Sequence, residues 1–155
     1  MEKIKGGNKM KKIIIGVMMS AIFLVLGACG ANNDVKNAAT YLPKVVKYAA
    51  KLTLFSNQVP LIAQQAVIDP NARIEFEEKL KEMKSEIQTV NALTPPSQLQ
   101  ELHTQLVAAN KLLEAGIDQY LAAIKDGKLN QEFVDNLSIT QPIDQITNVI
   151  NQMQN

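Results

Sequence analysis

Apolar residues recur at alternating spacings of three and four along four segments of this chain, and this spacing restricts the fold more than any other feature. It places the apolar side chains of each segment on one face of an α-helix. The four faces consist of Leu42, Val45, Ala49, Leu52, Phe55, Val59, Ile62 and Ala66; of Phe76, Leu80, Met83, Ile87 and Val90; of Leu99, Leu102, Leu106, Ala109, Leu113, Ile117 (or Gly116), Tyr120 and Ile124; and of Ile139, Ile143, Ile146, Ile150 and Met153. No segment alternates with the period of two that a half-buried strand requires, so no strand is predicted.

Proline and glycine residues separate these segments where helices are expected to begin and end. Asp69 can cap a helix whose first residue is Pro70. A Pro-Pro pair at 95–96 separates the second and third segments, and Gly127 stands where a left-handed residue would end the third. A short helix is predicted over 131–137, before the last segment. Amphipathic helices joined by short turns predict an all-α fold, an antiparallel bundle of about four helices.

The segment before residue 29 has the organisation of a secretory signal peptide. Five lysines precede an uncharged run of fourteen residues, Ile13–Leu26. A helix needs roughly 20 residues to cross the bilayer core, whereas a signal peptide needs about 7–15 apolar residues after a basic stretch. The segment 1–28 is therefore predicted to be removed. Met1 and Met10 are both compatible with the start of translation, because two lysines follow Met10 directly.

The end of the apolar run, Leu26-Gly27-Ala28-Cys29, resembles the lipobox of bacterial lipoproteins. The resemblance implies that a signal peptidase recognises Leu26, Gly27 and Ala28 and cuts before Cys29, whose thiol carries a diacylglyceryl group. It also implies a lipid anchor on the extracytoplasmic face of the bacterial cell membrane. The chain then divides into a signal peptide, 1–28, a lipidated tether, 29–40, and a helical bundle domain, 41–155. The alternative is an ordinary signal peptide or a signal anchor in which the cysteine is incidental.

The charge of the mature chain excludes nucleic acid as a partner. Five of the sixteen basic residues and one of the fifteen acidic residues lie before Cys29, which leaves eleven basic residues against fourteen acidic. A nucleic-acid-binding domain needs a basic excess, and a formal charge of about −3 is the opposite. Cys29 is the only cysteine, so no disulfide within the chain is predicted and stability depends on packing.

Three strings resemble an uncharacterised family of short lipoproteins from spore-forming Gram-positive bacteria. They are VPLIAQQAVIDP (Val59–Pro70), EMKSEIQTVNALTPP (Glu82–Pro96) and GIDQYLAAIKDGKLN (Gly116–Asn130). The resemblance spans nearly the whole mature chain. It implies a Gram-positive cell surface and the maturation pathway of a lipoprotein, and it implies no reaction.

No recognisable catalytic or metal-binding arrangement occurs in the sequence. His103 is the only histidine and lies on the flank of the third segment, near Glu101 and Lys111. A four-helix di-iron site needs two Glu-x-x-His pairs, and a nucleophilic serine of the hydrolase type needs Gly-x-Ser-x-Gly. Neither pattern is present. We therefore interpret His103 as a boundary residue whose ring packs against the core edge, and we predict no enzyme activity, no metal and no cofactor.

Charged residues form two stripes at helical spacing. Lys44, Lys47 and Lys51 share one face of the first helix, and Glu75, Glu78, Glu82 and Glu86 share one face of the second. In antiparallel neighbours these stripes either bridge at the seam or face solvent, where single pairs contribute under about 1 kcal/mol. The lysines could also face anionic lipid headgroups. Together the two stripes are the predicted interaction surface.

Two functional interpretations remain open from the sequence, with an enzyme as a third and least supported class. The first is a non-catalytic interaction module that docks an envelope protein or a wall component. The second is a small-ligand-binding lipoprotein with a pocket inside the bundle, near a kink at Pro60 and lined by Phe55, Phe76 and Tyr120. A two-lobed solute-binding protein is excluded by the 127 residues of the mature chain. Because the four apolar faces can cover one another, the domain is predicted to be a monomer.

Overall fold

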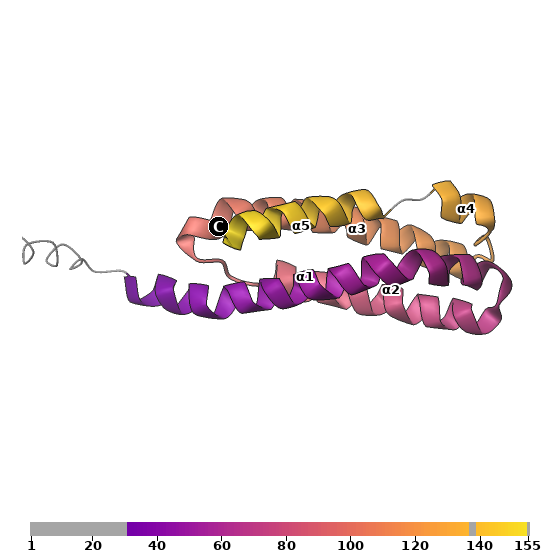
Figure 1. Ribbon diagram of the computed structural model, residues 1–155, viewed down its shortest axis with the longest axis horizontal. Coiled ribbons are helices and arrows are strands. Elements are labelled where there is room, and N and C mark those ends of the chain that lie inside the picture. Colours follow the sequence, from indigo (N-terminus) through magenta and orange to yellow (C-terminus); the bar gives the residue numbers. More distant parts are fainter. Residues whose placement is uncertain (1–30, 137–138, 155) are drawn as a thin grey trace, which may run out of the picture. The chain divides into compact units, whose positions relative to one another are not determined.

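The computed structural model describes residues 31–136 and 139–154, which form a bundle of α-helices (Figure 1). In chain order the elements are α1 (Ala31–Ile68), α2 (Pro70–Asn91), the 3₁₀ turn η1 (Ser97–Leu99), α3 (Gln100–Lys125), α4 (Gln131–Asn136) and α5 (Thr140–Gln154). No strand occurs within the described ranges, and the predicted all-α bundle is confirmed. From residue 33 onward these helices belong to one compact unit. The signal peptide, the lipobox and Cys29 lie outside the described residues.

Side-chain pairs between α1 and α3 show that these two helices run in the same direction. Tyr41 contacts His103, and Tyr48, seven residues later, contacts Asn110. Both pairs are separated by 62 positions, and a constant separation requires parallel helices in a fixed register.

Pairs that involve α2 show the opposite relation. Lys84 binds Asp118 of α3, and Gln88, four residues later, binds Glu114, four residues earlier. α2 is therefore antiparallel to α3, and it is likewise antiparallel to α1, with which it forms the ion pair Lys51–Glu86. α3 packs closely against both α2 and α5. In Figure 1, α1 and α2 lie along one side of the bundle and α3 and α5 along the other.

The apolar faces predicted for α2 and α5 are confirmed residue by residue, whereas the face of α1 is rotated slightly from the prediction. All five predicted residues of α2 and all five of the last segment are buried. In α1 six of the eight predicted residues are buried, but Leu42 and Ala49 are only partly buried, and Tyr41 and Tyr48 are buried beside the predicted face. The sequence favoured the aliphatic residues, but the tyrosines bury a larger apolar area and their hydroxyls find partners inside.

α1 begins at Ala31, so most of the predicted tether, 29–40, is helical. Within the tether, the residues from 31 onward therefore extend the first helix beyond the predicted start of the bundle domain at 41. The helix also runs without a break through Pro43 and Pro60. Both prolines are exposed, so the carbonyls that lose a backbone partner lie at the solvent side, where water can bind them. Within the described ranges no helix is long and apolar enough to span a membrane.

The predicted helix ends are confirmed by their hydrogen bonds. The side chain of Asp69 accepts from the backbone N–H of Asn71 at 2.8 Å, which caps α2. Gly127 has φ 66°, and the N–H of Lys128 donates to the carbonyl of Ala123 at 2.8 Å. This is the Schellman arrangement that ends a helix at a left-handed residue. The short helix predicted over 131–137 is α4.

Gly116 allows α5 to begin close to the middle of α3. A Cβ atom at this position would lie 2.9 Å from Cγ2 of Ile139, which is itself buried. Carbon atoms at that separation repel each other, and the β-branched side chain of Ile139 has few alternative rotamers.

We therefore expect Gly116→Ala to lower the melting temperature, although alanine in a helix interior is favoured by about 1 kcal/mol over glycine. The overpacking should outweigh this gain, because the surrounding core cannot move away freely. Thermal unfolding of the single variants and of Gly116→Ala combined with Ile139→Ala measures the coupling. The clash is disproved if Gly116→Ala lowers the melting temperature by as much in the Ile139→Ala background as in the wild type.

Candidate functional site

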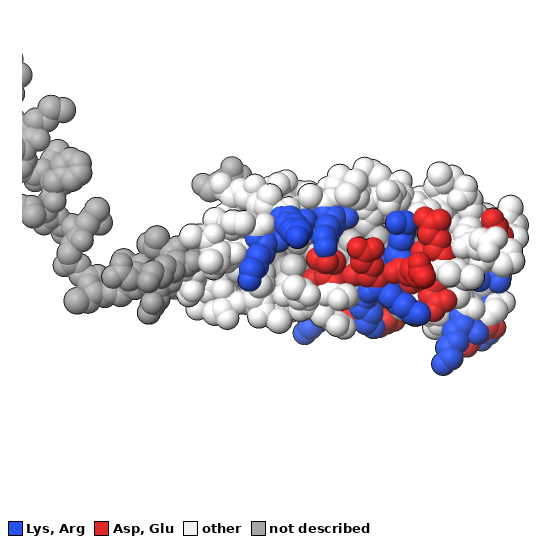
Figure 2. Space-filling view, turned by 90° about the horizontal axis from the view of Figure 1, so that it is seen from below, with Lys and Arg blue, Asp and Glu red and all other residues white. Residues whose placement is uncertain are grey.

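The predicted interaction surface lies on one outer face of the bundle, formed by α1 and α2. Figure 2 shows basic side chains gathered at one part of this face and acidic side chains in a row beside and beyond them. Lys44 and Lys47 are exposed and Lys51 is partly buried. Of the glutamates, Glu75, Glu78 and Glu82 are exposed and Glu86 is partly buried. The structure thus brings the two sequence stripes onto neighbouring helices.

The two stripes bridge at one point only. Lys51 forms an ion pair with Glu86 across the seam between α1 and α2. Among the described residues, Lys44 and Lys47 take part in no ion pair. Both sequence alternatives are therefore realised in part, since the innermost lysine bridges and the other two face outward. A pair about 30% exposed on each side contributes little to stability.

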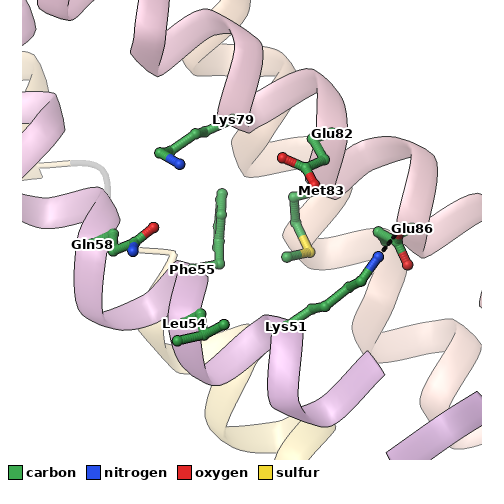
Figure 3. Close-up of a pocket in the computed structure, with 8 residues that line it drawn as sticks. All are labelled: Lys51, Leu54, Phe55, Gln58, Lys79, Glu82, Met83 and Glu86. Carbon is green, nitrogen blue, oxygen red and sulfur yellow. Dashed lines mark hydrogen bonds and ion pairs between the residues drawn. The ribbon is translucent and has the colours of Figure 1, made fainter. Parts of the chain in front are cut away.

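A groove of about 180 Å³ lies between the two stripes (Figure 3). Its lining residues are Lys51, Leu54, Phe55 and Gln58 from α1 and Lys79, Glu82, Met83 and Glu86 from α2. Phe55 and Met83 are almost fully buried and provide an apolar floor, with exposed fractions of 6% and 4%. In Figure 3 the Lys51–Glu86 pair closes one end of the groove, and Lys79 stands at the other.

Leu54 gives the groove an apolar edge. Its side chain is 59% exposed, directly beside the buried Phe55. An apolar floor with an exposed leucine and a charged rim has the composition of a protein-docking site, where a desolvated centre is surrounded by polar residues. The sequence identified Lys51, Glu82 and Glu86 of this site, but it did not identify Lys79 or Leu54. The missed signal was the spacing of Leu54, Leu61 and Ile68 on the outer side of α1.

A second group of polar residues lies inside the bundle and is fully paired. The hydroxyl of Tyr41 lies 2.8 Å from Nδ1 of His103, and the hydroxyl of Tyr48 donates to Oδ1 of Asn110 at 2.6 Å. Nδ2 of Asn110 in turn donates to Oδ1 of Asn91 at 2.7 Å. Among the described residues every buried side-chain nitrogen and oxygen has a partner. We call these five residues the polar ladder.

Burial governs the electrostatics of the polar ladder. Burial lowers the pKa of His103 below its ordinary value, and a hydrogen bond to the backbone of Asn91 offsets part of this effect. Since that bond requires a ring N–H, Nδ1 is left to accept from Tyr41. Burial also raises the pKa of Tyr41 to about 12, so its hydroxyl keeps its proton. His103 was expected at the core edge, and the structure finds it buried and hydrogen-bonded.

Of the three residues proposed for a pocket near Pro60, Phe55 and Phe76 do not line one there. Phe76 and Tyr120 pack edge to face with ring centroids 5.3 Å apart, so they fill the core. Phe55 lines the groove described above, on the α1–α2 face. Pro60 and Tyr120 do border a hollow of about 210 Å³ next to the start of α5. No cluster of three His, Cys, Asp or Glu residues that could hold a metal ion occurs in the described part of the chain.

Residues 41–155 match the profile of a family of unknown function, DUF6376. The chain belongs to this family. It is also 27% identical over 143 residues to the uncharacterized lipoprotein YybP of Bacillus subtilis (strain 168), a match that covers 92% of this chain and 97% of the relative. No solved structure matches the chain.

The comparison with YybP extends beyond the bundle. Only 127 residues lie from Cys29 onward, so a match over 143 residues must continue into the segment before Cys29. The relationship to an uncharacterised lipoprotein family, which the sequence motifs indicated, is confirmed.

The lowered pKa of His103 predicts a pH dependence of stability. The folded protein binds a proton at His103 less readily than the unfolded chain, whose histidine has a pKa of about 6.5. Stability from this residue is therefore complete above that value and is lost as the pH falls through it toward the lowered folded pKa. The groups that bind the ring, the hydroxyl of Tyr41 and the backbone of Asn91, carry no charge that would compensate.

We expect the wild-type domain to lose more stability than His103→Gln between pH 7.5 and pH 5.5, measured by urea unfolding. Glutamine keeps one acceptor and one donor group but does not titrate, so carboxylates contribute equally to both proteins. Equal losses in the two proteins would show that His103 is not desolvated as the structure indicates.

Proposed function

We propose that this protein is a lipoprotein anchored through Cys29 to the extracytoplasmic face of the cell membrane, where its helical bundle acts as a non-catalytic docking module. The anchor is supported by Leu26-Gly27-Ala28-Cys29 and by the relationship to a lipoprotein over nearly the whole chain. An unidentified envelope protein or wall component is the general class of partner. The alternative function is small-ligand binding, which requires that the volume of the groove reach the volume that a small ligand needs.

The observation that carries the docking role is the groove between α1 and α2. Its apolar floor, Phe55 and Met83, is open to solvent at an edge formed by Leu54 and is bordered by charges of both signs. A volume of about 180 Å³ is below the roughly 300–1,000 Å³ of typical small-molecule sites. The groove therefore suits the side chains of a macromolecular partner better than a whole small ligand.

The non-catalytic role is supported by the pairing of the polar groups. The residues of the polar ladder, of which only Asn91 is partly exposed, use donors and acceptors on one another, and they hold the helices in place. The charged groups at the groove are spread along a rim and do not converge on one point (Figure 3). General acid–base catalysis needs a positioned group within hydrogen-bond reach of a reacting atom.

Cys29→Ser is expected to abolish lipidation, because Cys29 is the only thiol of the chain. Two acyl chains are needed for stable membrane anchoring, so the variant should remain unprocessed or be released from the membrane. Metabolic labelling with a fatty-acid analogue followed by fractionation measures both effects. Label retained on Cys29→Ser would disprove the anchor at this residue.

A photoreactive amino acid at position 58, in the full-length protein on living cells, is expected to crosslink to a protein partner. Gln58 lines the groove and is exposed, so the substitution should not disturb the fold. The matched control is the same amino acid at Leu112, which is 56% exposed on α3 and does not line the groove. The docking role predicts at least one crosslinked product that is specific to position 58. It is contradicted if position 58 gives no product or only products that position 112 also gives.

A further inference from the structure

α1 carries a second helical stripe on its outer side, which the core does not use. Its members continue at spacings of three and four but are exposed or only partly buried, unlike the core stripe. They are Lys44, Lys47, Lys51, Leu54, Gln58, Leu61, Gln65 and Ile68. The first three are basic, whereas Leu54, Leu61 and Ile68 are apolar and 59%, 60% and 85% exposed. We call this the outer seam. Such a repeat is the sequence pattern of a helix that packs against another helix.

The charges beside the outer seam change sign along its length. Because α1 and α2 are antiparallel and Lys51 faces Glu86, Lys44 and Lys47 lie toward one end of the groove. Glu75 and Glu78 lie toward the other end. Counting Lys44, Lys47, Lys51 and Glu86, the first end has a formal charge of +2. Counting Glu75, Glu78, Glu82 and Lys79, the second end has −2. Figure 2 shows the basic cluster at one part of the face and the acidic row beside and beyond it, with further basic side chains along that row.

Equal and opposite charges at the two ends make the face complementary to itself. If a second copy is turned end to end by a two-fold axis, the basic end of each copy meets the acidic end of the other. A parallel arrangement would place like charges against each other, which is costly at an interface. A two-fold interface uses the same patch on both subunits, and this patch meets that requirement.

We propose that the partner docked at the α1–α2 groove is a second copy of this chain, antiparallel to the first across a two-fold axis near Leu54. This inference rests on the proposed docking function and names its partner. The pair Lys51–Glu86 fixes which residues of α1 lie beside each glutamate of α2. Along α1, Leu54 lies midway between the basic residues and the positions beside Glu75, Glu78 and Glu82, so the axis falls near Leu54. Leu54 then meets Leu54 of the second copy above the apolar floor of each groove.

The proposed second copy departs from the monomer that the sequence predicted. That prediction rested on four core faces that cover one another within one chain. The outer seam is an additional face, and it became visible only when the structure showed Leu54, Leu61 and Ile68 outside the core.

Disulfide trapping in the full-length, membrane-bound protein tests the position of the axis. Cys29 is the only native cysteine, so wild type is the control for any bond through that residue. Under mild oxidation, Leu54→Cys is expected to form a covalent dimer, whereas wild type and Leu112→Cys are not. Leu112 is a matched control because it is similarly exposed on α3. Absence of the Leu54→Cys dimer would overturn the proposal, and so would an equal yield from Leu112→Cys.

A charge exchange in the Leu54→Cys background tests the antiparallel arrangement. Lys44→Glu with Lys47→Glu should make both ends acidic, and Glu75→Lys with Glu78→Lys should make both ends basic. Each double variant alone is expected to lose the covalent dimer, and co-expression of the two should restore it as a mixed dimer. High salt should lower the wild-type yield, because it screens exposed charges.

The outcomes separate this inference from the docking function on which it rests. Failure of the mixed dimer to form, while each double variant still folds, would overturn the two-fold arrangement. A crosslink from position 58 to a different protein, without a Leu54→Cys dimer, would overturn the second copy as partner and leave the docking function standing. No crosslink and no dimer would overturn both.

Discussion

The polar ladder is the constraint on which the rest of the bundle depends. Apolar stripes alone allow neighbouring helices to slide by a turn or a heptad, because aliphatic side chains pack with little directional preference. Two tyrosines seven residues apart on α1 meet two polar residues seven residues apart on α3, and a slip would leave the hydroxyls and the asparagine amide unpaired. An unpaired buried polar group costs about 1–3 kcal/mol. The polar ladder therefore sets register, as single buried asparagines do in coiled coils.

The orientation of α1 has a direct consequence for the surface. Once Tyr41 and Tyr48 point inward, the opposite side of the helix presents Leu54, Leu61 and Ile68 to solvent. The same rotation brings Lys51 against Glu86 and opens the groove over Phe55 and Met83. The candidate docking site is thus a result of the buried hydrogen bonds, although none of the ladder residues lines the groove. The buried hydrogen bonds thus hold the interior together, and the proposed docking role falls to the outer face.

The extension of α1 bears on how such a module is presented. A helix that begins at Ala31 starts two residues after the cysteine that the lipobox motif assigns as the anchor. The interval between anchor and bundle is then largely a continuation of the first helix. A helix rises about 1.5 Å per residue and is stiffer than a coil, so it restricts the orientations of the attached domain more than a flexible linker would.

The sequence by itself determined the helical class, the faces of α2 and α5 and the helix ends at Asp69 and Gly127, because these depend on local spacing and on backbone conformation. It also indicated the lipoprotein family and the two charged stripes. Only the tertiary structure decided that Tyr41 and Tyr48 belong to the core and that Asn110 is fully buried. Those assignments depend on partners 62 positions away, and no local pattern contains them. The groove also depends on tertiary packing, since it exists only where α1 packs against α2, with the nearly buried Phe55 and Met83 as its floor between the charged flanks of the two helices.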